Sequence, residues 1–135
     1  MALGQSLDEL NWDVLVALGW KIEPVEKFHG RQLYSIFDPT GRVRGTDEGD
    51  PYSVAKRQGS IPLYAMSETM ALKLLEDYEY TINRRYYTNS QGVRTLLYYV
   101  SLLNEKVFFS QDLAYAVCKC FLDIKQKESS NAVLP

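Results

Sequence analysis

A β-hairpin is predicted by residues 80–102, which read YTINRRYYTNSQGVRTLLYYVSL. The first part, Tyr80 to Tyr87, alternates two sets of substantial side chains, as a strand does when both of its faces are occupied. Residues 89–92, NSQG, are typical of a hairpin turn. Residues 93–102 then return as a strongly apolar strand. Because its apolar side chains point to both faces, we expect helices to cover one face and a second subunit the other.

A second hairpin is predicted upstream. Residues 33–37, LYSIF, form a strand that runs into Asp38-Pro39-Thr40-Gly41, a turn signal in which Asp bonds its own backbone, Pro presets φ and Gly accepts positive φ. Residues 42–44 return antiparallel to it. A shorter strand over residues 20–23 is expected to end at Pro24, and the Gly-rich and Asp-rich residues 45–62 are expected to form a long surface loop.

Three helices surround these hairpins in the sequence. Each begins at a serine whose hydroxyl accepts hydrogen bonds from first-turn amides, and each carries apolar residues at helical spacing. The expected helices, with their capping serines, cover residues 7–18 (Ser6), residues 67–78 (Ser67) and the segment from Ser110 to about Lys125.

The predicted order is helix, hairpin, helix, hairpin, helix. Such an order is typical of an α+β fold in which an antiparallel sheet of two hairpins is layered with three helices, as in an αβα sandwich. We expect one domain over residues 1–127 and a flexible tail over residues 128–135.

Composition limits the classes of function. Apolar residues make up 46% and charged residues 24% of the chain, which excludes a disordered, collagen-like or coiled-coil protein. The net charge of −2 gives no general attraction to nucleic acid polymers or anionic membranes. No signal segment, apolar span or disulfide framework is visible, so a cytoplasmic protein is expected. His29 has no Cys or carboxylate at ligand spacing, and neither a metal nor another cofactor is predicted.

The candidate binding residues lie in and beside the 80–102 hairpin. Alternation places one arginine and one tyrosine on each face of the first strand, and a guanidinium beside an aromatic ring suits a nucleotide, whose base stacks while its phosphate takes the arginine fork. A solvent-facing strand with cross-strand pairs is the competing interpretation. Arg42 and Arg44 share one face of the other hairpin and complete the predicted set, especially across a symmetric homo-oligomer. The hairpin candidates are Arg84, Arg85, Tyr86, Tyr87, Asn89 and Arg94.

The sequence also resembles the small phage proteins of the ABA sandwich family. The resemblance covers about residues 7–123 and rests on the order and spacing of four segments. These are Leu18-Gly19-Trp20, the turn segment from Phe37 to Val43, Ile61 to Ser67, and Leu113 to Cys118.

The resemblance implies a function. Related phage anti-Thoeris proteins act as sponges that sequester cyclic ADP-ribose signals and, in some members, cyclic oligonucleotides, and their pockets between subunits use arginines, an aromatic ring and an asparagine. A similar role here implies a non-enzymatic protein of the host cell cytoplasm. The matching residue types are Arg84 or Arg85, Tyr86 or Tyr87, Asn89 and Arg94.

Two other functions remain open at this point. One is a protein-binding inhibitor or accessory phage protein with no small-molecule ligand, which the aromatic content favours. The other is an enzyme that cleaves a signal molecule, which the lack of an evident acid–base pair disfavours.

Overall fold

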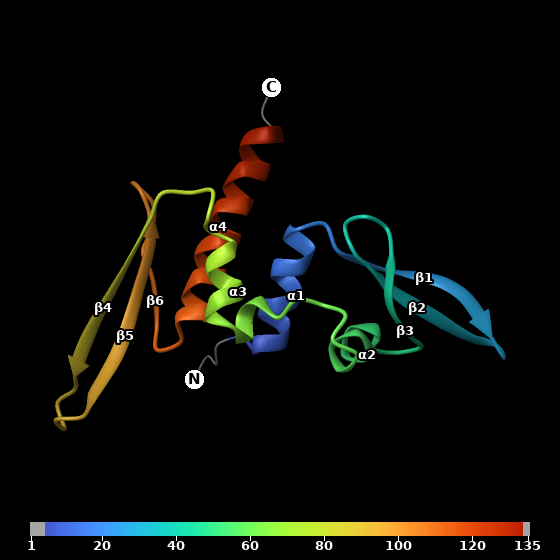
Figure 1. Ribbon diagram of the computed structural model, residues 1–135, viewed down its shortest axis with the longest axis horizontal. Helices are drawn as coiled ribbons and strands as arrows, with labels where there is room; N and C mark the ends of the chain where they lie inside the picture. The colour runs from blue at the N-terminus through green and yellow to red at the C-terminus, as the bar shows by residue number, and fades with distance from the viewer. Residues whose placement is uncertain (1–4, 134–135) are drawn as a thin grey trace. The chain divides into compact units, whose positions relative to one another are not determined.

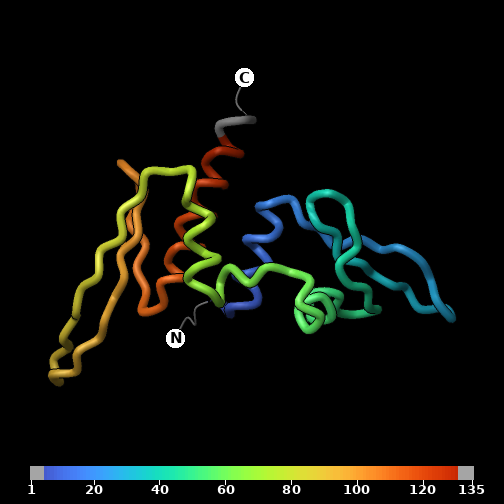
Figure 2. The backbone as a smooth tube through the Cα atoms, in the orientation of Figure 1, coloured from blue at the N-terminus to red at the C-terminus, as the bar shows by residue number. Residues whose placement is uncertain are grey.

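The computed structural model describes residues 5–133 of the chain (Figures 1 and 2). The sequence predicts one domain over residues 1–127, whereas the contacts of the backbone form two compact units. The first unit combines the chain up to Val14 with the chain from Leu63 onward, and the second unit is Leu15–Pro62. Each unit contains a three-stranded antiparallel sheet, so the α+β class is confirmed.

The two predicted hairpins belong to separate sheets, which differs from the single layered sheet that the sequence suggests. Each hairpin takes a third strand from its own neighbourhood in the chain, so neither depends on the other for hydrogen-bonding partners. The observed order is one helix, three strands, two α-helices separated by a 3-10 turn, three strands and a final helix.

The first helix, α1 (Leu7–Ala17), begins where the sequence predicts. The Ser6 hydroxyl accepts a hydrogen bond from the Glu9 backbone N–H at 3.1 Å, as an N-cap does. Leu10 and Val14 are fully buried, which is the outcome expected of its apolar stripe.

The second unit contains β1 (Lys21–Phe28), β2 (Arg31–Phe37) and β3 (Val43–Asp47) in the order β1-β2-β3. The prediction that the first strand ends at Pro24 is wrong, because β1 continues through it with a register shift between Pro24 and Lys27. An edge strand tolerates proline, since one of its sides has no ladder partner for the missing N–H.

The predicted turn at residues 38–41 is confirmed by the hydrogen bond from the Gly41 N–H to the Asp38 carbonyl at 2.9 Å. The buried Asp38 carboxylate accepts hydrogen bonds from the Thr40 N–H and hydroxyl, from the Arg42 N–H and, at 2.8 Å, from Arg44 Nε. One carboxylate therefore organises the whole turn.

The predicted loop at residues 45–62 instead contains the helix α2 (Pro51–Arg57). Asp50 caps it by accepting from the Ser53 N–H at 3.0 Å, and Pro51 occupies the first turn, where a missing N–H costs nothing. Periodicity did not indicate this helix because it is short and buries only Pro51 and Ala55.

Gly45 allows α2 to lie directly on β3. A Cβ at this position would approach the Pro51 carbonyl oxygen to 2.9 Å and the Ala55 Cβ to 3.0 Å. We expect Gly45→Ala to lower the free energy of unfolding by about 1–3 kcal/mol, the usual cost of overpacking. Urea unfolding checks this, with Gly49→Ala as the matched control, because the nearest atom to a Cβ there is 3.9 Å away. Equal stability of the two variants would contradict the close packing.

The first unit continues with a 3-10 turn at Tyr64–Met66 and the helix α3 (Glu68–Lys73). The Ser67 hydroxyl accepts from the Met70 N–H at 3.2 Å, which confirms the predicted cap. The helix ends earlier than the predicted residue 78, because residues 74–77 form turns that lead into the sheet.

The sheet of the first unit contains β4 (Tyr80–Thr88), β5 (Arg94–Leu102) and β6 (Phe108–Ser110), with β5 in the middle. The hairpin predicted from residues 80–102 is thus confirmed, and its turn closes with a 3.0 Å hydrogen bond from the Gly92 N–H to the Asn89 carbonyl. The short third strand, β6, was not predicted.

The last helix, α4 (Leu113–Val133), packs on β5, β6 and α3. Its expected cap was wrong: Ser110 ends β6, and Asp112 accepts from the Tyr115 N–H at 3.4 Å instead. The helix also extends beyond Lys125 into the segment expected to be a flexible tail. An ion pair between Lys125 and Glu128, at 3.3 Å, joins the helix to the start of that segment and supports the extension. Residues 134–135 of the expected tail lie outside the described residues.

Candidate functional site: the β4–β5 hairpin

The register of β4 and β5 decides which candidate residues share a face. Directly paired residues point to the same face of a sheet, so Ile82 goes with Val100 and Tyr80 with Leu102. Val100 is fully buried and Leu102 nearly so, which identifies the face that packs on α4. We call it the inner face. The opposite, outer face carries Thr81, Asn83, Arg85 and Tyr87 from β4, Thr95, Leu97, Tyr99 and Ser101 from β5, and Phe109 from β6.

Three predicted residues gather on the inner face near the turn. The guanidinium of Arg94 lies over the Tyr86 ring, 4.2 Å from its centroid. The two residues are diagonal neighbours, because Arg94 pairs with Thr88 and Tyr86 with Leu96, and long side chains reach across that diagonal. Arg84 lies two positions along β4 from Tyr86 on the same face. We call Arg84, Tyr86 and Arg94 the Arg/Tyr cluster.

The cluster is exposed, although it lies on the face that packs on α4 further along the strands. Tyr86 is 63% exposed, and Arg84 and Arg94 are exposed as well. Figure 1 shows the reason: the turn end of the β4–β5 hairpin lies well away from α3 and α4. Within the described part of the chain, neither arginine has an ion-pair partner. The cluster therefore presents two guanidinium groups without ion-pair partners and the aromatic ring of Tyr86, which Arg94 covers on one side.

Arg85 and Tyr87 occupy the outer face and do not join this cluster. Both are exposed, and Tyr87 is 59% accessible. The sequence left open which face would bring an arginine and a tyrosine together, and the register decides it in favour of Arg94 and Tyr86.

The side chain of Asn89 is engaged in the turn, and its role in ligand binding stays a prediction. Its side-chain oxygen accepts hydrogen bonds from the backbone N–H groups of Gln91 at 2.9 Å and Val93 at 3.0 Å. Asparagine is common in tight turns for this reason, so the residue type alone did not separate turn chemistry from ligand chemistry.

Arg42 and Arg44 belong to the second unit and to a different hairpin. Arg44 forms a 2.8 Å ion pair with Asp38, whose carboxylate is buried, so its guanidinium is engaged in the turn. The backbone N–H of Arg42 donates to the same carboxylate at 3.0 Å. Arg44 thus has a structural role in the turn, and its part in an anion pocket stays a prediction.

One residue was missed by the sequence analysis. Tyr98 pairs with Arg84 across the hairpin, so it belongs to the inner face beside the cluster, where it is half-buried. The sequence signal was misleading, since counting outward from a turn at residues 89–92 pairs Thr88 with Val93 and therefore Arg84 with Leu97. The Asn89 N–H instead bonds the Val93 carbonyl at 3.0 Å, which shifts the pairing by one residue and places Tyr98 opposite Arg84.

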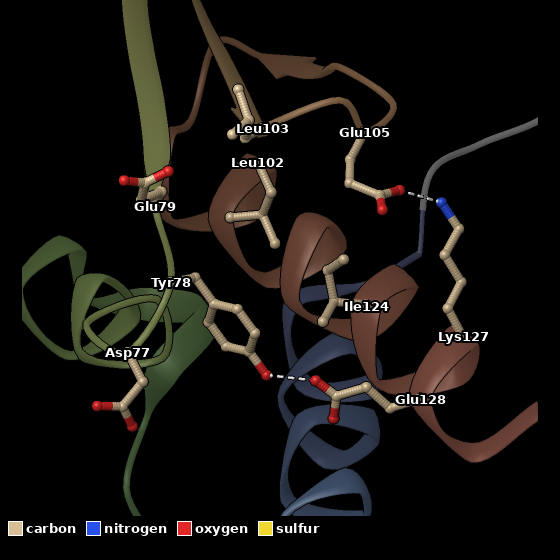
Figure 3. Close-up of a pocket in the computed structure, with 9 residues that line it drawn as sticks. All are labelled: Asp77, Tyr78, Glu79, Leu102, Leu103, Glu105, Ile124, Lys127 and Glu128. Atoms are coloured by element: carbon tan, nitrogen blue, oxygen red, sulfur yellow. Dashed lines mark hydrogen bonds and ion pairs between the residues drawn. The ribbon is translucent and has the colours of Figure 1, made fainter. Parts of the chain in front are cut away.

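A cavity of about 440 Å³ lies at the opposite end of the hairpin, between the entry to β4, the exit of β5 and α4 (Figure 3). The Tyr78 hydroxyl donates a 2.7 Å hydrogen bond to Glu128, which raises the pKa of Tyr78 and lowers that of Glu128. Ion pairs occupy its rim, because Lys127 contacts Glu105 and Lys125 contacts Glu128. None of the predicted binding residues lines this cavity.

Other reactive groups are held within the fold. Burial raises the pKa of Cys118 to about 12 and that of Cys120 to about 11, so both buried thiols stay protonated at neutral pH. No group of three or more potential metal-ligating side chains occurs among residues 5–133. In the same range, no helix is both long enough and apolar enough to cross a membrane.

The Arg/Tyr cluster offers a definite chemistry. The Arg94 guanidinium lies over the Tyr86 ring, and the N–H groups of a guanidinium can bind two phosphate oxygens at once. The side of the guanidinium that faces away from Tyr86 is a surface on which a base can stack.

Models of known protein families and curated proteins were both searched, and neither search gave a match to this chain.

Proposed function

We propose that this chain is a non-catalytic binding protein that takes up a cyclic nucleotide signal on the Arg/Tyr cluster and withholds it from its receptor. The observation that carries the proposal is the Arg94 guanidinium held over the Tyr86 ring, with Arg84 on the same exposed face. The resemblance to phage sponge proteins adds the biological role, an anti-defence protein acting in the host cytoplasm on a cyclic ADP-ribose isomer or a cyclic oligonucleotide.

The chemistry of such a ligand matches the cluster. Cyclic nucleotides carry phosphates joined to flat bases, so one molecule presents both an anion and a stacking surface. Arg84 and Arg94 supply the charge-assisted hydrogen bonds, while Tyr86 and the half-buried Tyr98 supply aromatic surface. Base stacking of this kind contributes about 1–3 kcal/mol per base.

Sequestration fits the cluster better than hydrolysis. Among the described residues of the inner face, those flanking the cluster are Ile82, Thr88, Leu96 and Tyr98, which include no carboxylate or imidazole. General acid–base catalysis needs such a group within hydrogen-bond reach of the reacting atoms. Binding without turnover is therefore the expected behaviour.

The test is native mass spectrometry of the purified protein mixed separately with cyclic ADP-ribose isomers and with cyclic di- and trinucleotides. We expect one compound of this panel to add its intact mass to the protein and to be recovered unchanged. A ligand-free protein across the whole panel would overturn the proposal in favour of a protein-binding role. Recovery of a cleaved product would overturn it in favour of an enzyme.

Substitution locates the site. Arg94→Ala removes both the phosphate fork and the group stacked on Tyr86, so we expect the dissociation constant for the bound nucleotide to rise by about 10–100-fold, the value of a charged hydrogen bond. Isothermal titration calorimetry measures the change. Lys73→Ala, which removes one exposed positive charge from α3, is the control and should leave the dissociation constant unchanged. Equal effects of the two variants would mean that charge alone, and not the cluster, binds the ligand.

A further inference from the structure

The cavity of Figure 3 combines an apolar wall with acidic sides. Leu102 and Ile124 are nearly buried beneath it, and the ring of Tyr78 is fixed beside them by the hydrogen bond to Glu128. Small-molecule sites in proteins usually have volumes of about 300–1,000 Å³ and mix apolar walls with a few polar groups. The cavity has a volume of about 440 Å³, and its lining belongs to one compact unit, so its size and chemistry suit a small ligand.

The charges around the cavity favour a cation. Its lining carries a surplus of three negative charges, and two further charged groups that contact the lining, Lys125 and Asp123, cancel each other. A hollow lined by one sign of charge with apolar walls concentrates ions of the opposite sign. The charged residues of the lining are Asp77, Glu79, Glu105, Glu128 and Lys127.

One side of the cavity already holds an aliphatic ammonium group. The Lys127 ammonium contacts the Glu105 carboxylate and lies 3.2 Å from Asp123. The hydrogen bonds to Glu105 and then to Asp123 raise the pKa of Lys127, so the pair of carboxylates stabilises the charged amine. The fold thus shows which kind of cation two carboxylates accept at this end of the sheet.

The other side has a second pair of carboxylates. Asp77 and Glu79 line the cavity, and neither has an ion-pair partner among the described residues. Figure 3 shows both on the side of Tyr78 away from Lys127. Between the two sides lie Leu102 and Ile124, with Leu103 above them. A hydrated metal ion gains nothing from such an apolar wall, whereas an alkyl chain is removed from water against it.

We propose that this cavity binds a linear aliphatic diamine or polyamine. One ammonium group of the ligand pairs with Asp77 and Glu79, and its methylene chain lies along Leu103 and Ile124. A second ammonium reaches Glu128, since a carboxylate has about four acceptor positions and its contacts with Tyr78 and Lys125 leave some of them open.

Two features of the cavity select a ligand with several amines over a single amine. Carboxylates stand on both sides of the apolar wall, so one ammonium group would neutralise only one side. The Tyr78 ring lies between the sides, and an aromatic face attracts ammonium groups. The cavity is at the opposite end of the hairpin from the Arg/Tyr cluster, and this proposal does not rest on the proposed nucleotide function.

The experiment is isothermal titration calorimetry of the full chain with spermidine. We expect a dissociation constant below about 1 mM for the unmodified protein. Asp77→Asn/Glu79→Gln should raise that constant by about 3–30-fold, the combined value of two exposed charge pairs. The matched control is Glu26→Gln/Glu68→Gln, which removes two exposed carboxylates outside the cavity and should leave the dissociation constant unchanged.

Two other cations separate the proposed chemistry from general attraction. Butylamine has one ammonium group and magnesium chloride has no alkyl chain, so at equal ionic strength each should bind at least about tenfold more weakly than spermidine. Circular dichroism establishes that each variant is folded.

Three results would overturn the proposal. The first is no heat of binding with spermidine at about 10 mM. The second is an equal loss of affinity in the control variant. The third is magnesium binding as tight as that of spermidine, which would mean that charge alone attracts cations here. Nucleotide binding measured on the same samples persists or fails independently of these results.

Discussion

Replacing Asn11 with alanine is expected to lower the free energy of unfolding by about 2–4 kcal/mol, the sum of a lost buried hydrogen bond and a small cavity. Asn11 is fully buried in α1, and its side-chain oxygen accepts a 3.2 Å hydrogen bond from the Ala65 backbone N–H in the 3-10 turn. Ala65 is also fully buried, so its N–H would lose its acceptor in a place that water does not reach. An unpaired buried donor costs more than the hydrogen bond itself contributes.

Chemical denaturation of Asn11→Ala measures this loss. The control is Gln126→Ala, an exposed residue of α4, which should change the free energy of unfolding by less than about 0.5 kcal/mol. If the two variants were equally stable, the hydrogen bond between α1 and the 3-10 turn would not be holding these segments together.

Asp38→Asn is expected to lower the melting temperature by several degrees at pH 7. The hydrogen bond from the Thr40 hydroxyl, together with those from the Arg42 N–H and Arg44, holds the pKa of the Asp38 carboxyl well below its ordinary value of 3.8. The substitution removes the negative charge that Arg44 contacts at 2.8 Å and turns an amide N–H₂ toward one of these donors. The turn of the β2–β3 hairpin should therefore lose its central acceptor.

The pH dependence identifies the cause. A carboxyl whose pKa is lowered by folding stabilises the protein fully above its unfolded pKa and loses this contribution as the pH falls toward its folded pKa. The difference in melting temperature between the two proteins should thus be constant near neutral pH and shrink below about pH 4. Differential scanning calorimetry from pH 3 to pH 7 follows it, with Glu26→Gln in the exposed strand β1 as the control. A difference that stays constant to pH 3 would show that Asp38 acts by packing and not by its charge.

Local chemistry was sufficient for several features of this protein. The turns at residues 38–41 and 89–92 and the caps at Ser6 and Ser67 were predicted correctly, because each depends on groups within a few residues of one another. The α+β class followed from the number and order of such local signals.

Other features depended on weaker local signals or on distant partners. The helix α2 is too short for periodicity to reveal, and the continuation of β1 past Pro24 is possible only because that strand lies at an edge. The last helix continues beyond residue 125, where Glu128 accepts a hydrogen bond from Tyr78, a residue distant in the sequence. The division into two sheets likewise depends on which strands pair, and not on where the strands lie in the sequence.

The candidate site shows the same separation. The sequence by itself determined that arginines and tyrosines alternate along β4 beside a second arginine-bearing strand, because alternation is a property of any extended chain. Only the tertiary structure decided that Tyr86 stacks with Arg94, that Asn89 and Arg44 serve turns, and which face α4 covers. The physical reason is that a strand fixes which side chains share a face, while the pairing register and the packed helix fix what each face meets.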